Sequence, residues 1–163
     1  MVARIGEEGL RPSSDLPGEE GLRPSSRPPG APFGIPVRVY YQDTDAGGVV
    51  FHAQYLSFME RARTELLIAR GFDLARCAVE ERVLFMVHAI TVRYHRPAVL
   101  NDLLQVTARV SALGRASVGF AQRVERDGEL LVEGAVKLAL VDRDRLRPVR
   151  MPQSLQSVLE STE

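Results

Sequence analysis

One stretch of helical periodicity in this chain is followed by strand periodicity through most of the remaining residues. Five hydrophobic residues recur at steps of four and three: Tyr55, Met59, Ala62, Leu66 and Ala69. This spacing predicts an amphipathic helix, which Gly71 is suited to end. From Met86 onward, hydrophobic and polar residues alternate, as in strands with one buried face. One long helix combined with several such strands predicts an α+β fold.

The alternating segments predict five strands. The strand before the helix is expected where Val37, Val39 and Tyr41 alternate with Arg38, Tyr40 and Gln42. The later strands are expected at residues 86–95, 104–112, 116–124 and 130–141. Asp127-Gly128 is a strong signal for a two-residue hairpin. We therefore predict a strand, a helix and four strands in an antiparallel meander, with residues 72–81 as a connection. Pro152 is suited to begin a short terminal helix that runs to about Glu160.

The residues between the first strand and the helix combine carboxylates, glycines and a helix start. Asp43 and Asp45 precede Gly47-Gly48, where the lack of a Cβ allows positive φ and a close approach of another molecule. The amides at the helix start, near residues 51–53, would stabilise a developing oxyanion. A carboxylate and an oxyanion site would then face one another. The alternative is that both aspartates only cap a turn and a helix.

The same residues carry a resemblance to a known family. The segment from Asp43 to His52, together with the run from Glu60 to Glu65, resembles the signature of the Tol-Pal-associated acyl-CoA thioesterases. These proteins belong to the 4-hydroxybenzoyl-CoA thioesterase family of hotdog-fold proteins. The similarity extends over about residues 36 to 152 and includes four further segments: Tyr94 to Ala98, Asp102 to Leu104, Gly114 to Ser117, and Arg147-Pro148. It implies a hotdog fold, in which one long helix is wrapped by a five-stranded antiparallel sheet, in agreement with the periodicity.

The resemblance also implies roles for individual residues. Asp45 is expected to attack the thioester carbonyl or to activate water, while the main-chain amide of His52 binds the carbonyl oxygen. Asp43 is expected to orient the loop, with a direct contact to the substrate as the alternative. Arg115 matches a region where relatives place basic residues against the phosphates of CoA, although a solvated turn arginine is the alternative. The full set of expected substrate contacts is Gly47, Gly48, Val49, Phe51, Tyr55, Arg115 and Ser117.

The implied activity is hydrolysis of a short-chain or aromatic acyl-CoA, or of an acyl carrier protein thioester, without a cofactor. A non-catalytic acyl-CoA-binding module is the alternative, because a fold does not fix function. Asp45 beside an oxyanion site favours the enzyme. Gln42 and Phe51 stand where relatives often carry Glu and Tyr, so the role of a second carboxylate or of a phenol stays open.

Other catalytic and binding classes lack support in the sequence. The 3 histidines are 36 and 7 residues apart, which matches no zinc pattern. Ser117 has no His-Asp arrangement that would mark it as a nucleophile, and Gly47-Gly48 lacks the Lys-Ser/Thr of a phosphate loop. Lys plus Arg and Asp plus Glu both total 21, so no net charge favours nucleic acid or an anionic membrane as a partner.

The N-terminal residues differ in composition from the rest of the chain. The segment Gly6 to Ser14 recurs unchanged as Gly18 to Ser26 and is rich in Gly, Pro, Ser and Glu. Such a composition buries little apolar surface and predicts disorder. We therefore predict a tail at residues 1–34, a hotdog domain at 35–152, and a short helix or tail at 153–163.

Cellular location and assembly complete the expectations. The single cysteine, Cys77, cannot form an internal disulfide, which fits the cytoplasm. No apolar run approaches the ~18 residues of a membrane span, and no apolar signal core is seen, so a soluble, unexported protein is expected. Related hotdog proteins join their sheets edge to edge, which implies a dimer at least and favours a tetramer. The family name implies a tie to the Tol-Pal envelope system.

Overall fold

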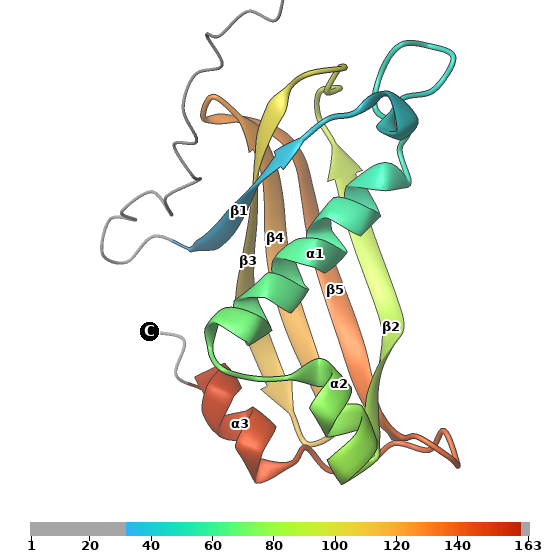
Figure 1. The fold of residues 1–163 in the computed structure, drawn as a ribbon, viewed down its shortest axis with the longest axis vertical. Helices are drawn as coiled ribbons and strands as arrows, with labels where there is room; N and C mark the ends of the chain where they lie inside the picture. Colours follow the sequence, from blue (N-terminus) through green and yellow to red (C-terminus); the bar gives the residue numbers. More distant parts are fainter. Residues whose placement is uncertain (1–31, 161–163) are drawn as a thin grey trace, which may run out of the picture. The chain divides into compact units, whose positions relative to one another are not determined.

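The computed structural model of this chain describes residues 32–160, which form one five-stranded antiparallel sheet with helix α1 across one face (Figure 1). The strands are β1 (Phe33–Arg38), β2 (Val83–Tyr94), β3 (Leu103–Gly114), β4 (Ser117–Arg126) and β5 (Glu129–Asp142). The helical segments are η1 (Tyr41–Asp43), α1 (Gln54–Ala69), α2 (Leu74–Arg76), η2 (Cys77–Glu81) and α3 (Gln153–Glu160). The predicted α+β class with a five-stranded antiparallel sheet is confirmed. The duplicated segment lies outside the described residues.

The strand order is β1-β3-β4-β5-β2, so β2 pairs with β5 and not with β3. The predicted meander of four strands is therefore wrong for β2, although β3, β4 and β5 do form one. Asp127 and Gly128 both have positive φ, at 51° and 82°, as the predicted hairpin turn requires. A tight turn forces its two strands to be neighbours. The longer link at residues 95–102 lets the chain cross from one edge of the sheet towards the other.

β1 begins earlier and ends earlier than its alternation predicts. Phe33 and Gly34, assigned to the tail, already pair with β3. The strand ends at Arg38, and the 3₁₀ turn η1 follows. Tyr41 is consequently 81% exposed instead of buried.

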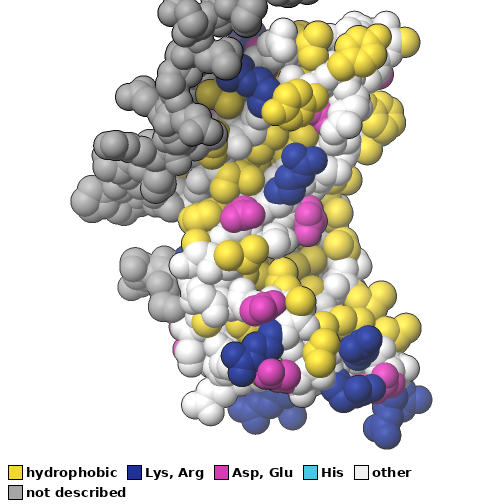
Figure 2. Space-filling model, in the orientation of Figure 1, with side chains coloured by type: hydrophobic (Ala, Val, Ile, Leu, Met, Phe, Trp, Pro, Cys, Tyr) yellow, Lys and Arg dark blue, Asp and Glu magenta, His cyan; other side chains and the backbone are white. Residues whose placement is uncertain are grey.

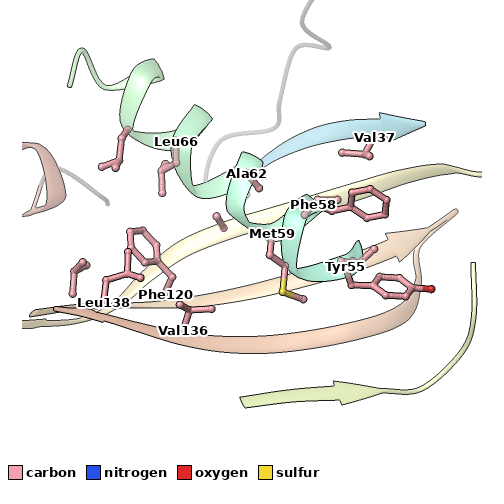
Figure 3. Close-up of a cluster of buried hydrophobic side chains, with 14 of the residues drawn as sticks. Val37, Tyr55, Phe58, Met59, Ala62, Leu66, Phe120, Val136 and Leu138 are labelled. Carbon is pink, nitrogen blue, oxygen red and sulfur yellow. The ribbon is translucent and has the colours of Figure 1, made fainter. Parts of the chain in front are cut away.

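The core lies between α1 and the sheet. α1 is 16 residues long and directs its apolar face onto the sheet (Figure 3). The side chains that meet there include Phe58, Met59, Ala62, Leu66, Phe120, Val136 and Leu138. Gly134 accommodates the helix, since a Cβ there would lie 2.9 Å from the sulfur of Met59. Burying each large apolar side chain stabilises the fold by roughly 1.5–3 kcal/mol.

Two segments outside α1 also contain short helices: residues 72–81 and the residues after Pro152. Residues 72–81 were predicted as a connection but contain α2 and the π-helical turn η2. Asp73 starts α2 by accepting the N–H groups of Ala75 and Arg76 at 2.9 and 3.0 Å. The predicted terminal helix is confirmed as α3, and its Leu155 and Leu159 are buried in the core. Among residues 32–160, no helix is long and apolar enough to cross a membrane.

Candidate active site

The loop between β1 and α1 folds back on itself as a small hairpin. The Phe51 N–H donates to the Asp43 carbonyl at 2.9 Å, and the Asp45 N–H donates to the Val49 carbonyl at 2.9 Å. Gly48 makes the reversal at φ +76°, a conformation that glycine adopts without strain. The Val50 N–H donates to the Ala98 carbonyl at 2.9 Å, which ties the loop to the segment before β3. Hydrogen bonds within the loop and to the segment before β3 therefore fix the path of this loop.

Asp43 holds the loop from inside. Its side chain is 2% exposed, and it accepts the Tyr40 N–H at 2.8 Å and the Gln54 side-chain amide at 2.8 Å. One carboxylate thus joins the end of β1 to the first residue of α1. With both oxygens engaged, Asp43 has the loop-orienting position expected for it.

Asp45 has a different environment. Its side chain is exposed, and Oδ1 accepts the Gly47 N–H at 2.7 Å. Oδ2 has no hydrogen-bond partner within residues 32–160. A Cβ on Gly47 would lie 3.0 Å from Oδ1, so a larger residue there would crowd the carboxylate. Asp45 therefore caps a turn with one oxygen and keeps the other open to solvent.

The start of α1 presents main-chain donors beside this loop. Ala53 occupies the N-cap position without a side-chain cap, and in the described part of the chain the N–H groups of His52 and Ala53 have no acceptor. The His52 carbonyl accepts the Tyr94 hydroxyl at 2.9 Å. This bond holds the plane of the His52–Ala53 peptide. Two free N–H groups at a helix start form a suitable place for negative charge.

Tyr55, one of the expected substrate contacts, is part of the core. It is 2% exposed, and its hydroxyl accepts the Ala98 N–H at 2.8 Å. Its ring meets the ring of Tyr94 edge to face, with centroids 5.8 Å apart. Burial raises the pKa of the Tyr55 hydroxyl, while the bond from Ala98 opposes that shift. Its role within this chain is to hold the segment before β3 against α1.

The other expected contacts fall into two places. Gly47, Gly48, Val49 and Phe51 lie in the loop with Asp45, and the Phe51 ring is 45% exposed and packs on His52. Arg115 and Ser117 lie in and after the β3–β4 turn, which the Arg115 carbonyl joins to Met151 next to α3. This turn is at the opposite end of β3 from the loop (Figure 1). A strand of 12 residues spans roughly 36 Å, so one chain does not bring Arg115 near Asp45.

Sequence reasoning missed two residues that shape the site. Gln54 and Tyr94 each make one of the bonds that fix the loop and the start of α1. Tyr94 lies 42 positions from His52, and only the fold brings them together. The one sequence signal for Tyr94 is its position in the segment Tyr94 to Ala98, which is part of the family resemblance. No cluster of three or more His, Cys, Asp or Glu side chains suited to a metal occurs among residues 32–160.

Comparison with known proteins relates most of the described domain to one family. The family described as "Thioesterase superfamily" matches residues 47–133. "Acyl-CoA thioesterase YbgC" of Haemophilus influenzae is 43% identical over 125 residues, covering 77% of this chain and 92% of that protein. "Acyl-CoA thioester hydrolase YbgC" of Escherichia coli O6:H1 is 44% identical over 121 residues, covering 74% and 90%. A crystal structure of a probable thioesterase from Bartonella henselae superposes with a TM-score of 0.71 at 36% identity, covering 75% and 100%.

Proposed function

Because the chain belongs to the thioesterase superfamily, we propose that it is an acyl-CoA thioester hydrolase whose chemistry takes place between Asp45 and the start of α1. Water adds across the thioester, the C–S bond breaks, and the products are a carboxylic acid and the free thiol. The acyl group is proposed to be short or aromatic, and acyl carrier protein is an alternative carrier. No cofactor takes part.

The observation that carries this proposal is the pair of N–H groups at His52 and Ala53, which have no acceptor among residues 32–160, next to the loop that exposes Asp45. A thioester carbonyl oxygen that accepts the His52 N–H would gain negative charge as the carbonyl is attacked, and the helix start stabilises that charge. The Tyr94 hydroxyl donates to the His52 carbonyl on the next peptide, which limits movement of the chain at the start of α1. Donors that are already oriented lose little energy in reorganising during the reaction.

Asp45 supplies the carboxylate. Its free Oδ2 can attack the carbonyl carbon and form an anhydride that water then hydrolyses, or it can take a proton from an attacking water molecule. In both routes the thiolate leaves and is protonated from solvent. The bond from Gly47 to Oδ1 limits rotation of the side chain in either case.

Replacement of Asp45 tests the assignment. Asp45→Asn keeps the size of the side chain and its bond to Gly47, and we expect kcat to fall by about 10² or more while the protein stays folded. The measurement is thiol release across a panel of acyl-CoA thioesters. Asp73→Asn is the matched control, because Asp73 is an exposed aspartate that also accepts main-chain N–H groups. Turnover near wild type in Asp45→Asn would remove Asp45 from the mechanism, and binding without any thiol release by the wild type would favour the non-catalytic module.

We also propose assembly into a homodimer at least, with a tetramer favoured. β2 is an edge strand, and its exposed hydrophobic side chains line that edge of the molecule (Figure 2). They are Met86, Val87, Ile90 and Tyr94, at 41–56% exposure. Pairing with a second copy would cover part of this apolar surface and satisfy the open edge. A monomeric mass by light scattering at micromolar protein would contradict this.

Cytoplasmic location and a tie to the Tol-Pal system stay proposals that rest on the family resemblance. Affinity purification of the tagged full-length chain from its native cells, with envelope and cytoplasmic fractions separated beforehand, tests both. Recovery in the cytoplasmic fraction is expected. Absence of every Tol-Pal component from the purified material would count against the physical tie.

A further inference from the structure

A buried arginine that the proposed reaction does not use lies between α1 and the sheet. Arg63 is 9% exposed, and its Nη1 donates to the side-chain oxygen of Gln122 at 3.0 Å. Gln122 in turn donates to the Met59 carbonyl at 2.7 Å. Within residues 32–160, Arg63 forms no ion pair with a carboxylate. A buried cation without a counter-ion is costly, and burial lowers the pKa of Arg63 while the charge of Glu60 opposes that shift.

Most of the donors of this guanidinium are unused. Arginine has five N–H donors, and Gln122 takes one of them. In the described residues no fully buried side-chain nitrogen or oxygen lacks a partner. The remaining nitrogens of Arg63 are therefore open to free space and are not sealed among apolar atoms.

Two cavities beside α1 provide that space. One has a volume of about 310 Å³ and the other about 170 Å³, and both are lined by Glu60, Arg63 and Val87. The other lining residues are mainly apolar, apart from Ser57 and Arg61 in the first cavity and Thr64 in the second. They include Leu56, Ile90 and Val136 in the first cavity, and Leu67, Leu74, Phe85, Phe120 and Leu138 in the second. The first cavity is therefore a mainly apolar space that is also lined by one carboxylate, Glu60, and two guanidiniums, Arg61 and Arg63, of which Arg63 is the buried one.

The first cavity begins close to the proposed oxyanion site. α1 begins two residues after His52, so Leu56 lies in its first turn, and Arg63 lies about 10 Å further along the helix axis at 1.5 Å per residue. Long side chains on a helix lean back toward its N-terminus, which shortens the distance from the guanidinium to a thioester at His52. An acyl group of moderate length that leaves the thioester could therefore extend to Arg63.

We propose that this cavity receives the acyl group and that Arg63 selects acyl groups that end in a carboxylate, as in the monothioesters of dicarboxylic acids. The inference rests on the proposed function and adds a substrate class to it. A carboxylate can accept two N–H groups of one guanidinium and neutralises its charge. An acyl group that ends in a methyl would displace water from the guanidinium and leave those donors unpaired.

Matched substrate pairs test this selection. In each pair a terminal methyl replaces a carboxylate: hexanoyl-CoA against adipoyl-CoA, and 4-methylbenzoyl-CoA against 4-carboxybenzoyl-CoA. In at least one pair we expect the wild type to show a kcat/KM about tenfold or more higher for the carboxylate member. Equal values in both pairs, or a preference for the methyl members, would overturn the inference.

Arg63 variants assign the preference to this residue. Arg63→Met keeps the length of the side chain without the charge, and it should abolish the preference while changing kcat/KM for the methyl members less than about threefold. Arg63→Lys keeps the charge with fewer donors and should retain part of the preference, which guards against loss of folding in the first variant. Arg109→Met, at an exposed position on β3, is the control and should leave the preference intact. Equal losses on both members of a pair in a variant with a wild-type melting temperature would make Arg63 structural only.

The two proposals fail in different ways. Hydrolysis that depends on Asp45 but shows no preference for carboxylates leaves the proposed function standing and overturns the selection. If no thioester is hydrolysed, the proposed function fails, and calorimetric binding of free adipate and 4-carboxybenzoate still tests the cavity. Binding at least tenfold weaker to Arg63→Met than to the wild type would support the selection, and equal or absent binding would overturn it.

Discussion

The loop that carries Asp45 and the turn that carries Arg115 differ in how the chain holds them. In the loop, side chains fix the geometry: Asp43 accepts two hydrogen bonds in the interior, and Tyr94 binds the His52 carbonyl. In the turn, the main chain of Arg115 is held by Met151, and the exposed side chain has no partner within residues 32–160. The fold thus orients the proposed reacting groups in advance. Any partner of the Arg115 side chain must come from a ligand or a second copy.

The largest expected effect separates the two aspartates of the loop. Asp43→Ala should lower the free energy of unfolding by about 2–4 kcal/mol, because it leaves the Tyr40 N–H and the Gln54 amide, whose bonds to Asp43 are partly buried, without an acceptor. Asp45→Ala, at an exposed position, should change it by less than about 1 kcal/mol while abolishing turnover. Urea unfolding and thiol release measure the two effects. Equal destabilisation by both changes would show that Asp45 also supports the fold.

A smaller effect is expected where the loop meets β2. Tyr94→Phe removes one hydrogen bond to the His52 carbonyl and keeps the ring contact with Tyr55, so stability should fall by about 1 kcal/mol. kcat should fall several-fold, because the peptide at the start of α1 is held less firmly. Tyr41→Phe is the control, since Tyr41 is 81% exposed. An unchanged kcat in Tyr94→Phe would mean that the helix alone orients these donors.

The turn is tested by kinetics alone. Arg115→Ala should raise KM for acyl-CoA several-fold with little change in kcat, because a contact with a remote phosphate stabilises the ground and transition states alike. Its melting temperature should be unchanged. A short thioester without the nucleotide serves as the control and should be much less affected. Equal kinetics on both substrates before and after the change would assign Arg115 to the solvated surface.

The smallest effect is expected from the N-terminal residues. Removal of residues 1–31 should leave melting temperature and turnover nearly unchanged, since a segment rich in Gly, Pro, Ser and Glu offers little apolar surface for packing. Removal of residues 1–38, which includes β1, is the matched comparison and should destabilise the fold. Loss of turnover in the shorter deletion with an unchanged melting temperature would indicate a functional contact made by the segment.

Local sequence patterns predicted the positions of the strands and helices better than they predicted which strands lie next to one another in the sheet. Alternation located β3, β4 and β5 to within a few residues, and Asp127-Gly128 identified the hairpin between the last two. The same alternation failed after Arg38, because buried Asp43 draws the chain into a 3₁₀ turn and leaves Tyr41 in solvent. The alternation also did not predict that β2 pairs with the edge of β5 that faces away from β4. The order of strands joined by a long connection, such as residues 95–102, depends on contacts between residues distant in sequence.

For the candidate site, the sequence by itself determined the loop, because two aspartates, two glycines and a helix start lie within eleven consecutive residues, 43–53, and each acts through local backbone chemistry. Local spacing did not distinguish the buried Asp43 from the exposed Asp45, and their different expected roles did not come from it. The tertiary structure decided that difference. It also placed Tyr94 on His52, Gln122 on Arg63, and Arg115 at the far end of the sheet. Burial and contacts between distant segments exist only once the sheet and α1 have packed together, and no local pattern encodes them.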